Sequence, residues 1–89
     1  MAFNSASLSA LTYANGFTLW HYRTPDNNTD VDTTGYFNVA SAMLRVGDFI
    51  FANCSVNATP TNGVFVVTSN TGGVVDVSNM STFGSANTD

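Results

Sequence analysis

The residues that could support catalysis in this chain are few and scattered. The chain has one histidine, His21, and one cysteine, Cys54, and it contains no lysine, glutamate or glutamine. His21 stands between Trp20 and Tyr22 with no catalytic partner nearby in the sequence. Cys54 ends an apolar run in which no cation is placed to lower the pKa of its thiol. We therefore interpret His21 as a packing or interface residue and Cys54 as a buried, inert thiol, and we expect no catalytic residues and no enzyme.

The acidic loop Asp26–Asp32 is the best candidate for a metal site. Its first, third and fifth residues match the first three ligand positions of a calcium-binding loop. The sixth position, which should be glycine, is Val31, and the twelfth, which should be glutamate, is Phe37. One Cys and one His are too few ligands for a structural zinc site. We expect an ordinary solvated loop without metal or cofactor, and a weak ion site shared within an assembly is the alternative.

The composition excludes some partners and favours one class of fold. Charged residues make up 9% of the chain and the formal net charge is −4. Both cationic residues are arginines, Arg23 and Arg45, so the sequence predicts neither a nucleic-acid surface nor attraction to an anionic membrane. Ser, Thr and Asn replace the usual surface helix formers and disfavour helix interiors, whereas Val, Phe, Tyr and Thr suit strands. The composition therefore predicts strands and turns.

The order of apolar runs and turn residues predicts a mostly β fold. Strands are expected at 17–24, 48–54, 64–69 and 74–77, and Asn70–Gly73 is expected to join the last two as a hairpin. Residues 36–44 should contain one or two helical turns, because no long helical period follows. The prediction is a small antiparallel sheet, curled into a barrel or half-sandwich, with one short helical turn.

The chain is expected to form one domain with two short extensions. Residues 1–11 are interpreted as an N-terminal arm that docks on a neighbour, a disordered start being the alternative. Residues 12–80 are predicted to form a single β domain, and residues 81–89 a flexible tail. A domain of this size buries a modest core and commonly relies on assembly, metal or disulfides. With a single cysteine and few metal ligands, assembly is the expected support.

The expected strand at 17–24 carries apolar groups on both faces, which predicts a core on one side and a subunit contact on the other. Four aromatic residues are the interface candidates: Phe3, Trp20, Tyr22 and Tyr36. A sugar-binding platform formed by Tyr13 with Trp20, Tyr22 and Tyr36 is the alternative use of these rings. The core is expected to contain Phe17, Leu19, Phe49, Phe51, Val64, Val66 and Val75.

Three segments in a fixed order carry a resemblance to a known family. They are the runs NGFTLWHYRT at 15–24, VDTTGYFN at 31–38 and MLRVGDFI at 43–50. Over roughly residues 13–77 the chain resembles a family of small proteins of tailed bacteriophages and prophages, which are found among virion structural genes. The resemblance implies a place in a phage particle and implies no catalytic residue.

Two roles in a particle follow from the resemblance. The first is a capsid decoration (cement) protein at the capsid surface of the virion, a homotrimer that binds and stabilises the major capsid shell. Binding in many copies would reinforce a modest contact per subunit. The second is a head- or tail-fibre module that attaches to host-surface glycans. A small enzyme or an inhibitor of a host protein is a third, more remote, alternative.

Overall fold

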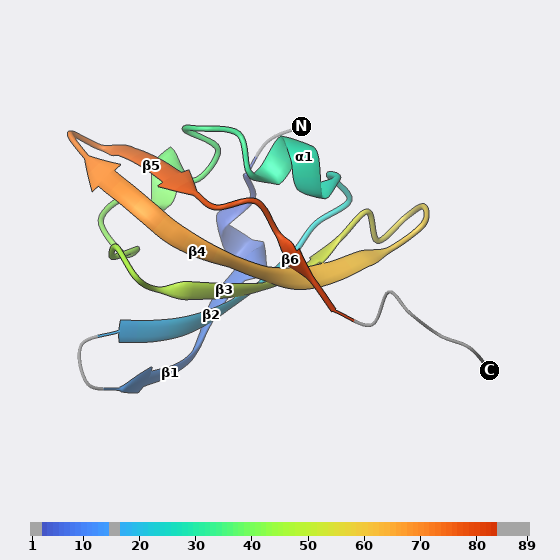
Figure 1. Cartoon of the computed structure of the whole chain (residues 1–89), viewed down its shortest axis with the longest axis horizontal. Helices are drawn as coiled ribbons and strands as arrows, with labels where there is room; N and C mark the ends of the chain where they lie inside the picture. The colour runs from blue at the N-terminus through green and yellow to red at the C-terminus, as the bar shows by residue number, and fades with distance from the viewer. Residues whose placement is uncertain (1–2, 15–16, 84–89) are drawn as a thin grey trace.

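The computed structural model describes residues 3–14 and 17–83, and this part of the chain forms one open, mixed sheet of six strands (Figure 1). The spatial order is β1-β2-β3-β4-β5, and β6 also pairs with β4. The strands are β1 (Leu8–Ala14), β2 (Phe17–Arg23), β3 (Phe49–Cys54), β4 (Thr61–Thr71), β5 (Val74–Val77) and β6 (Ser81–Thr82).

The prediction of a mostly β fold is confirmed, but the sheet is neither wholly antiparallel nor a closed barrel. β2 and β3 run parallel, with Leu19 opposite Phe49 and Arg23 opposite Asn53. Parallel neighbours need a long crossover connection, and here it consists of residues 24–48. The expected hairpin is confirmed, since β4 and β5 pair antiparallel on either side of Gly72 and Gly73, whose φ angles are positive.

The crossover contains two short helical elements. The first is α1 (Asn28–Val31), which lies inside the segment expected to be a loop. It begins after Asn27, whose side-chain oxygen accepts a hydrogen bond from the Asp30 amide at 2.9 Å, as N-cap residues do. The second is the 3-10 turn η2 (Asn38–Ala40), which confirms the helical turn expected within residues 36–44.

Both chain extensions contribute to the sheet. The 3-10 turn η1 (Ser5–Ser7) leads into β1, so Leu8–Leu11 are sheet residues and not part of a separate arm. The register with β2 shifts between Ala10 and Thr12, which leaves Leu11 as an extra residue in a β-bulge. At the other end, β6 lies against Gly63, where a Cβ would collide with the Ser81 carbonyl oxygen. The expected turn at Asn15-Gly16 lies outside the described residues.

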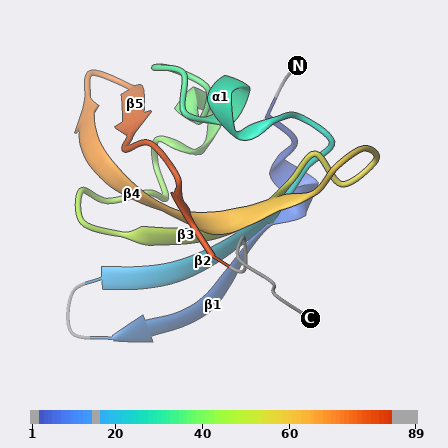
Figure 2. The same ribbon diagram turned by 45° about the vertical axis from the view of Figure 1, so that its right-hand side comes forward.

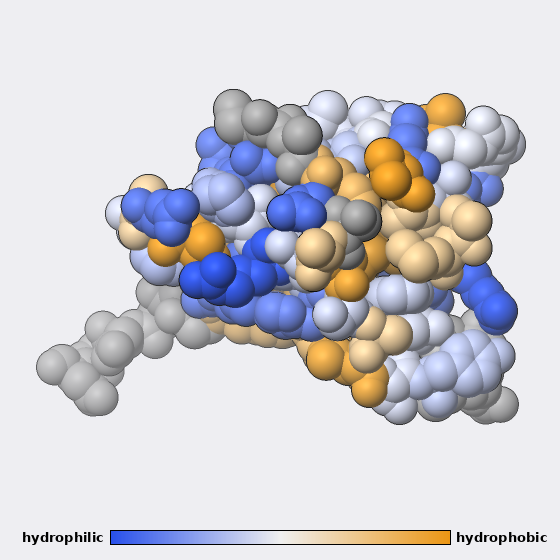
Figure 3. All heavy atoms as spheres, turned by 180° about the vertical axis from the view of Figure 1, so that it is seen from behind, coloured by the Kyte–Doolittle hydropathy of each residue, from blue (hydrophilic) through white to orange (hydrophobic). Residues whose placement is uncertain are grey.

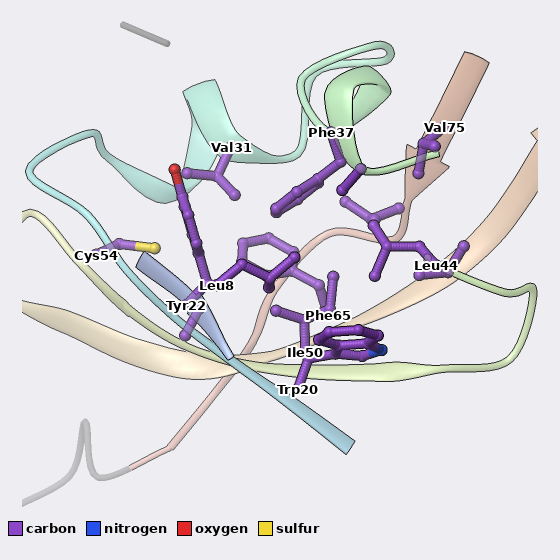
Figure 4. Close-up of a cluster of buried hydrophobic side chains, with 14 residues drawn as sticks. Leu8, Trp20, Tyr22, Val31, Phe37, Leu44, Ile50, Cys54, Phe65 and Val75 are labelled. Atoms are coloured by element: carbon purple, nitrogen blue, oxygen red, sulfur yellow. The ribbon is translucent and has the colours of Figure 1, made fainter. Parts of the chain in front are cut away.

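The core lies between one face of the sheet and the crossover. Side chains from the central strands point toward Val31, Phe37 and Leu44 of the crossover (Figure 4). The buried apolar side chains are Leu8, Trp20, Tyr22, Val31, Phe37, Ala40, Leu44, Ile50, Ala52, Cys54, Phe65, Val67, Val75 and Val77.

The predicted core residues lie mostly on the wrong face. Val75 is buried as expected. Leu19, Phe51, Val64 and Val66 are only half-buried on the face that the crossover leaves uncovered, and Phe49 is exposed there. The Phe17 side chain lies outside the described part. Because β2 carries apolar groups on both faces, the alternation of its residues could not show which face of the sheet is buried. The crossover determines which face is covered.

Candidate functional site

His21 lies on the uncovered face of β2 and hydrogen-bonds an amide side chain. Its Nε2 is 2.7 Å from Oδ1 of Asn53, and Nδ2 of Asn53 donates to Oδ1 of Asn62 at 2.7 Å. Because an amide oxygen only accepts, Nε2 of His21 is the donor in this arrangement. The three side chains form a polar row across β2, β3 and β4. The row contains neither a nucleophile nor a carboxylate, and it agrees with the interpretation of His21 as a packing residue.

Cys54 is fully buried at the end of β3. Burial, and secondarily the negative charge of Asp26, raises the pKa of the Cys54 thiol to about 11. The sulfur is therefore a protonated thiol at neutral pH, and it is the thiolate that acts as nucleophile or metal ligand. Among the described residues, no group of three potential ligands is placed to hold a metal ion.

The side chains of the acidic loop are used within the fold. Asp26 is buried, and its Oδ2 accepts a hydrogen bond from the Tyr36 hydroxyl at 2.7 Å. Asn27 caps α1 and also accepts from the Thr29 hydroxyl at 2.7 Å. The segment is a capped helical turn attached to the core.

Three of the four interface candidates lie in one aromatic cluster within the chain. Tyr22 is fully buried, Phe3 stacks on it with 5.3 Å between ring centroids, and Tyr36 meets it edge-on. Phe37 completes the cluster from the crossover. Phe3 thus docks on its own chain. A fully buried Tyr22 has no surface to offer a second chain, so the burial of this ring corrects its assignment to an interface.

A directed hydrogen-bond chain runs through this cluster. The Asn4 amide donates to the Tyr22 hydroxyl at 3.0 Å, Tyr22 and Tyr36 hydroxyls are 2.9 Å apart, and Tyr36 donates to Asp26. Since Tyr36 gives its only proton to the carboxylate, Tyr22 donates to Tyr36. Burial, followed by these hydrogen bonds, raises the pKa of Tyr36 well above its usual value. The chain ties the N-terminal segment to the crossover.

The folded state holds the protons of Cys54 and Tyr36 more tightly than the unfolded state, so stability should fall at high pH. For Cys54 the stabilisation is complete below pH 9.0, the ordinary thiol value, and declines as pH rises toward about 11. For Tyr36 the decline begins above 10.0. The urea concentration at the unfolding midpoint should be constant from pH 7 to 8 and decrease above pH 9. In Cys54→Ala this decrease should begin at a higher pH. A midpoint that rises between pH 9 and 11 would contradict this assignment.

The fourth interface candidate, Trp20, is buried against the Asp48 carboxylate. Trp20 Nε1 donates to Oδ2 at 3.1 Å, the Arg45 amide donates to the same oxygen at 3.0 Å, and the Thr18 amide donates to Oδ1 at 3.0 Å. Asp48 is itself completely buried. The carboxylate joins β2 to the turn that precedes β3, so the burial of Trp20 likewise corrects its assignment to an interface.

Exposed apolar side chains gather at one end of the sheet, which we call the apolar end. Arg45 lies over the Tyr13 ring at 5.6 Å, and Asn70 at the β4–β5 hairpin donates to the carbonyl of Leu44 at 2.7 Å, so three loops meet there. The register places the start of β3 beside them. The exposed apolar residues of this end are Tyr13, Met43, Val46, Phe49 and Val74.

The opposite end of the molecule is largely polar, although the exposed Phe83 lies beside Asn62 there. There β2 and β3 finish and α1 begins, since the Ser55 amide donates to the Asp26 carbonyl at 2.8 Å (Figure 1). Asp30 and Asp32 lie in and just after α1, and residues 57–60 form an exposed loop. Figure 3 views the molecule from behind, with the apolar end on the right. Hydrophobic side chains gather from the middle toward that side, and hydrophilic ones predominate on the other.

No pocket is found within the part of the chain that the structure describes. None of its helices has the length and apolar character needed to cross a membrane. Comparison with protein-family models, with curated proteins and with solved structures gave no match. The surface that stands out is the apolar end. No motif predicts it, because its residues come from β1, β3, β5 and the segment before β3, which are far apart in the sequence.

Proposed function

We propose that this chain is a non-catalytic structural protein of a phage virion, a capsid decoration protein that binds and stabilises the major capsid shell. The observation that carries the proposal is the apolar end. Val46 is 63% exposed and Tyr13 is 61% exposed. Contiguous exposed apolar residues on a small domain mark a contact surface. The resemblance of residues 13–77 to phage virion proteins supplies the class of partner.

The distribution of charge supports an orientation on the shell. The acidic side chains Asp30 and Asp32 are at the end opposite the apolar end, and the cation Arg45 lies beside Tyr13 within it. Arginine and aromatic side chains are enriched at interfaces, whereas acids on the outer side keep a particle soluble. The apolar end would therefore face the shell, and α1 would face away from it. Many copies on one shell would multiply a modest contact.

The experiment is a binding assay with expanded capsids that lack this protein. Wild-type protein should co-sediment with them and raise the temperature at which they disassemble. Val46→Asp should lose most of this binding, because it places a carboxylate in the desolvated centre of the contact. Asn57→Asp adds the same charge in the exposed loop at the polar end and should bind like wild type.

The assay also shows what would overturn the proposal. Circular dichroism must first show that both variants are folded, which the exposure of positions 46 and 57 favours. Failure of the wild-type protein to bind the capsids contradicts the decoration role. Equal binding by both variants contradicts the assignment of the contact to the apolar end.

The alternative of a glycan-binding fibre module has no observation in its favour. Of the four rings expected to form a sugar platform, Trp20 and Tyr22 are buried in the core and Tyr36 is half-buried in the aromatic cluster. Tyr13 is exposed but lies at the other end of β2 from Tyr22, opposite Thr18. The four rings do not form one surface.

A further inference from the structure

The two long edges of the sheet are treated differently by the rest of the chain. The outer edge of β5 is closed by the crossover. The Gly35 amide donates to the Val75 carbonyl at 2.9 Å, and the Val75 amide donates to Oδ1 of Asn38 at 2.9 Å. The Thr34 hydroxyl adds a bond to the Asp76 carboxylate at 3.2 Å. No second strand can add at Val75 without breaking these bonds.

The outer edge of β1 is open. β1 is the terminal strand of the sheet, and no other segment within residues 3–14 and 17–83 pairs with its outer side (Figure 2). Residues 9–13 are exposed, and Leu11 at the bulge is 56% exposed. An edge strand presents unpaired amides and carbonyls, and proteins commonly block such an edge with charges or proline. Leu8–Ala14 contains neither a charged residue nor proline.

We propose that the occupant of this edge is β1 of a second copy of this chain, paired antiparallel across a twofold axis. Backbone amides and carbonyls in a row select an extended strand as partner. A ring of three chains joined by strand pairing needs two different open edges per chain, whereas the crossover leaves only one long open edge in the described sheet. A symmetric pair uses the same edge twice. The proposed assembly is therefore a dimer, in place of the trimer expected from the sequence.

The uncharged edge lets two copies of the chain meet despite their net negative charge. The chain carries a net charge of −4, so copies of it repel one another except where they meet through uncharged surface. β1 is uncharged, and the half-buried acids Asp30 and Asp32 lie on the crossover. Two β1 strands can therefore pair without placing carboxylates opposite each other. The bulge at Leu11 bends the strand and limits the ladder to a short one.

The first test is the mass of the full chain in solution, measured by light scattering after size-exclusion chromatography over a range of concentrations. Wild-type protein should reach twice the 9.4 kDa mass of one chain. Leu11→Lys places a positive charge on each edge near the axis and should give a monomer where the wild type is a dimer. Val39→Lys adds the same charge at a position on η2 that is 77% exposed and should remain a dimer.

The second test locates the pairing. Single cysteines are introduced by Ser9→Cys, Ala10→Cys, Leu11→Cys, Thr12→Cys and Tyr13→Cys, and the proteins are oxidised. Residues nearest the axis lie within disulfide distance of their own symmetry mates. One or two positions should cross-link efficiently and the rest poorly. The buried Cys54 of the unmodified chain should give no cross-link and serves as the control.

The proposed β1 pairing does not depend on the decoration role, so the two proposals can fail independently. A monomeric or trimeric wild-type protein, or equal masses for Leu11→Lys and Val39→Lys, overturns the β1 pairing. Uniform cross-linking at all five positions, as random collisions would give, also overturns it. Val46 lies in the turn before β3 and not on β1, so capsid binding by a monomer would leave the decoration role intact.

Discussion

Replacing Asp48 by alanine should destabilise the fold by about 3 kcal/mol or more, because it leaves buried donors without an acceptor. The carboxylate is completely buried and accepts from the amides of Thr18 and Arg45 and from the Trp20 indole. A domain of this size has roughly 5–10 kcal/mol of total stability. Urea denaturation followed by Trp20 fluorescence should therefore show a large loss of the midpoint, or an unfolded chain.

Asp76→Ala is the matched control for Asp48→Ala. Asp76 is half-buried, and its side chain accepts one bond from the Thr34 hydroxyl near the surface. Its removal should cost about 1 kcal/mol or less. Similar losses of unfolding free energy for the two variants would show that the hydrogen bonds to Asp48 do not hold β2 against the turn before β3. Should Asp48→Ala fail to fold, Trp20→Phe removes one of the three donors and should give a smaller loss, which is followed by circular dichroism because this variant has no tryptophan.

Phe65→Ala should cost about 3–5 kcal/mol, the range for a buried aromatic side chain. Phe65 is fully buried on β4 and faces the crossover. Phe51→Ala, on the neighbouring strand but on the uncovered face, should cost roughly 1–2 kcal/mol because the ring is only half-buried. The comparison uses one residue type on two paired strands and tests which face is the core.

Equilibrium unfolding of the two phenylalanine variants measures the free energy that each ring contributes to the fold. A loss for Phe51→Ala as large as that for Phe65→Ala would show that the uncovered face is also closed in solution. Because a second chain could close it, the measurement is made at a concentration at which light scattering shows a monomer. At higher concentration, any additional loss for Phe51→Ala would report on assembly.

The positions of β2 to β5 were predictable from local patterns, whereas β1, β6 and the covered face of the sheet were not. β3, β5 and the β4–β5 hairpin follow from apolar runs and the Gly72-Gly73 turn. The parallel pairing of β2 and β3 depends on where residues 24–48 return, which no local pattern encodes. β1 was missed because Ser, Ala and Thr alternate in it with few large apolar residues.

The three segments on which the phage proposal partly rests lie in the framework of the fold. Trp20 and Asp48 bond to each other, Tyr22 and Tyr36 share a hydrogen-bond chain, and Asn38 closes the edge of β5. Their side chains therefore have a role within the fold itself. The apolar end has no such motif. Its residues are far apart in the sequence, and they were not predicted from it as a surface.

Cryo-electron microscopy of a virion that carries this chain is the most direct test of its role. We expect density for the six-stranded sheet on the outside of the capsid shell, with Tyr13, Met43 and Val46 against the major capsid protein and α1 facing solvent. Absence of the chain from the shell, or its location in a tail fibre, would contradict the decoration role. A shell contact made by the α1 end would contradict the assignment of the apolar end.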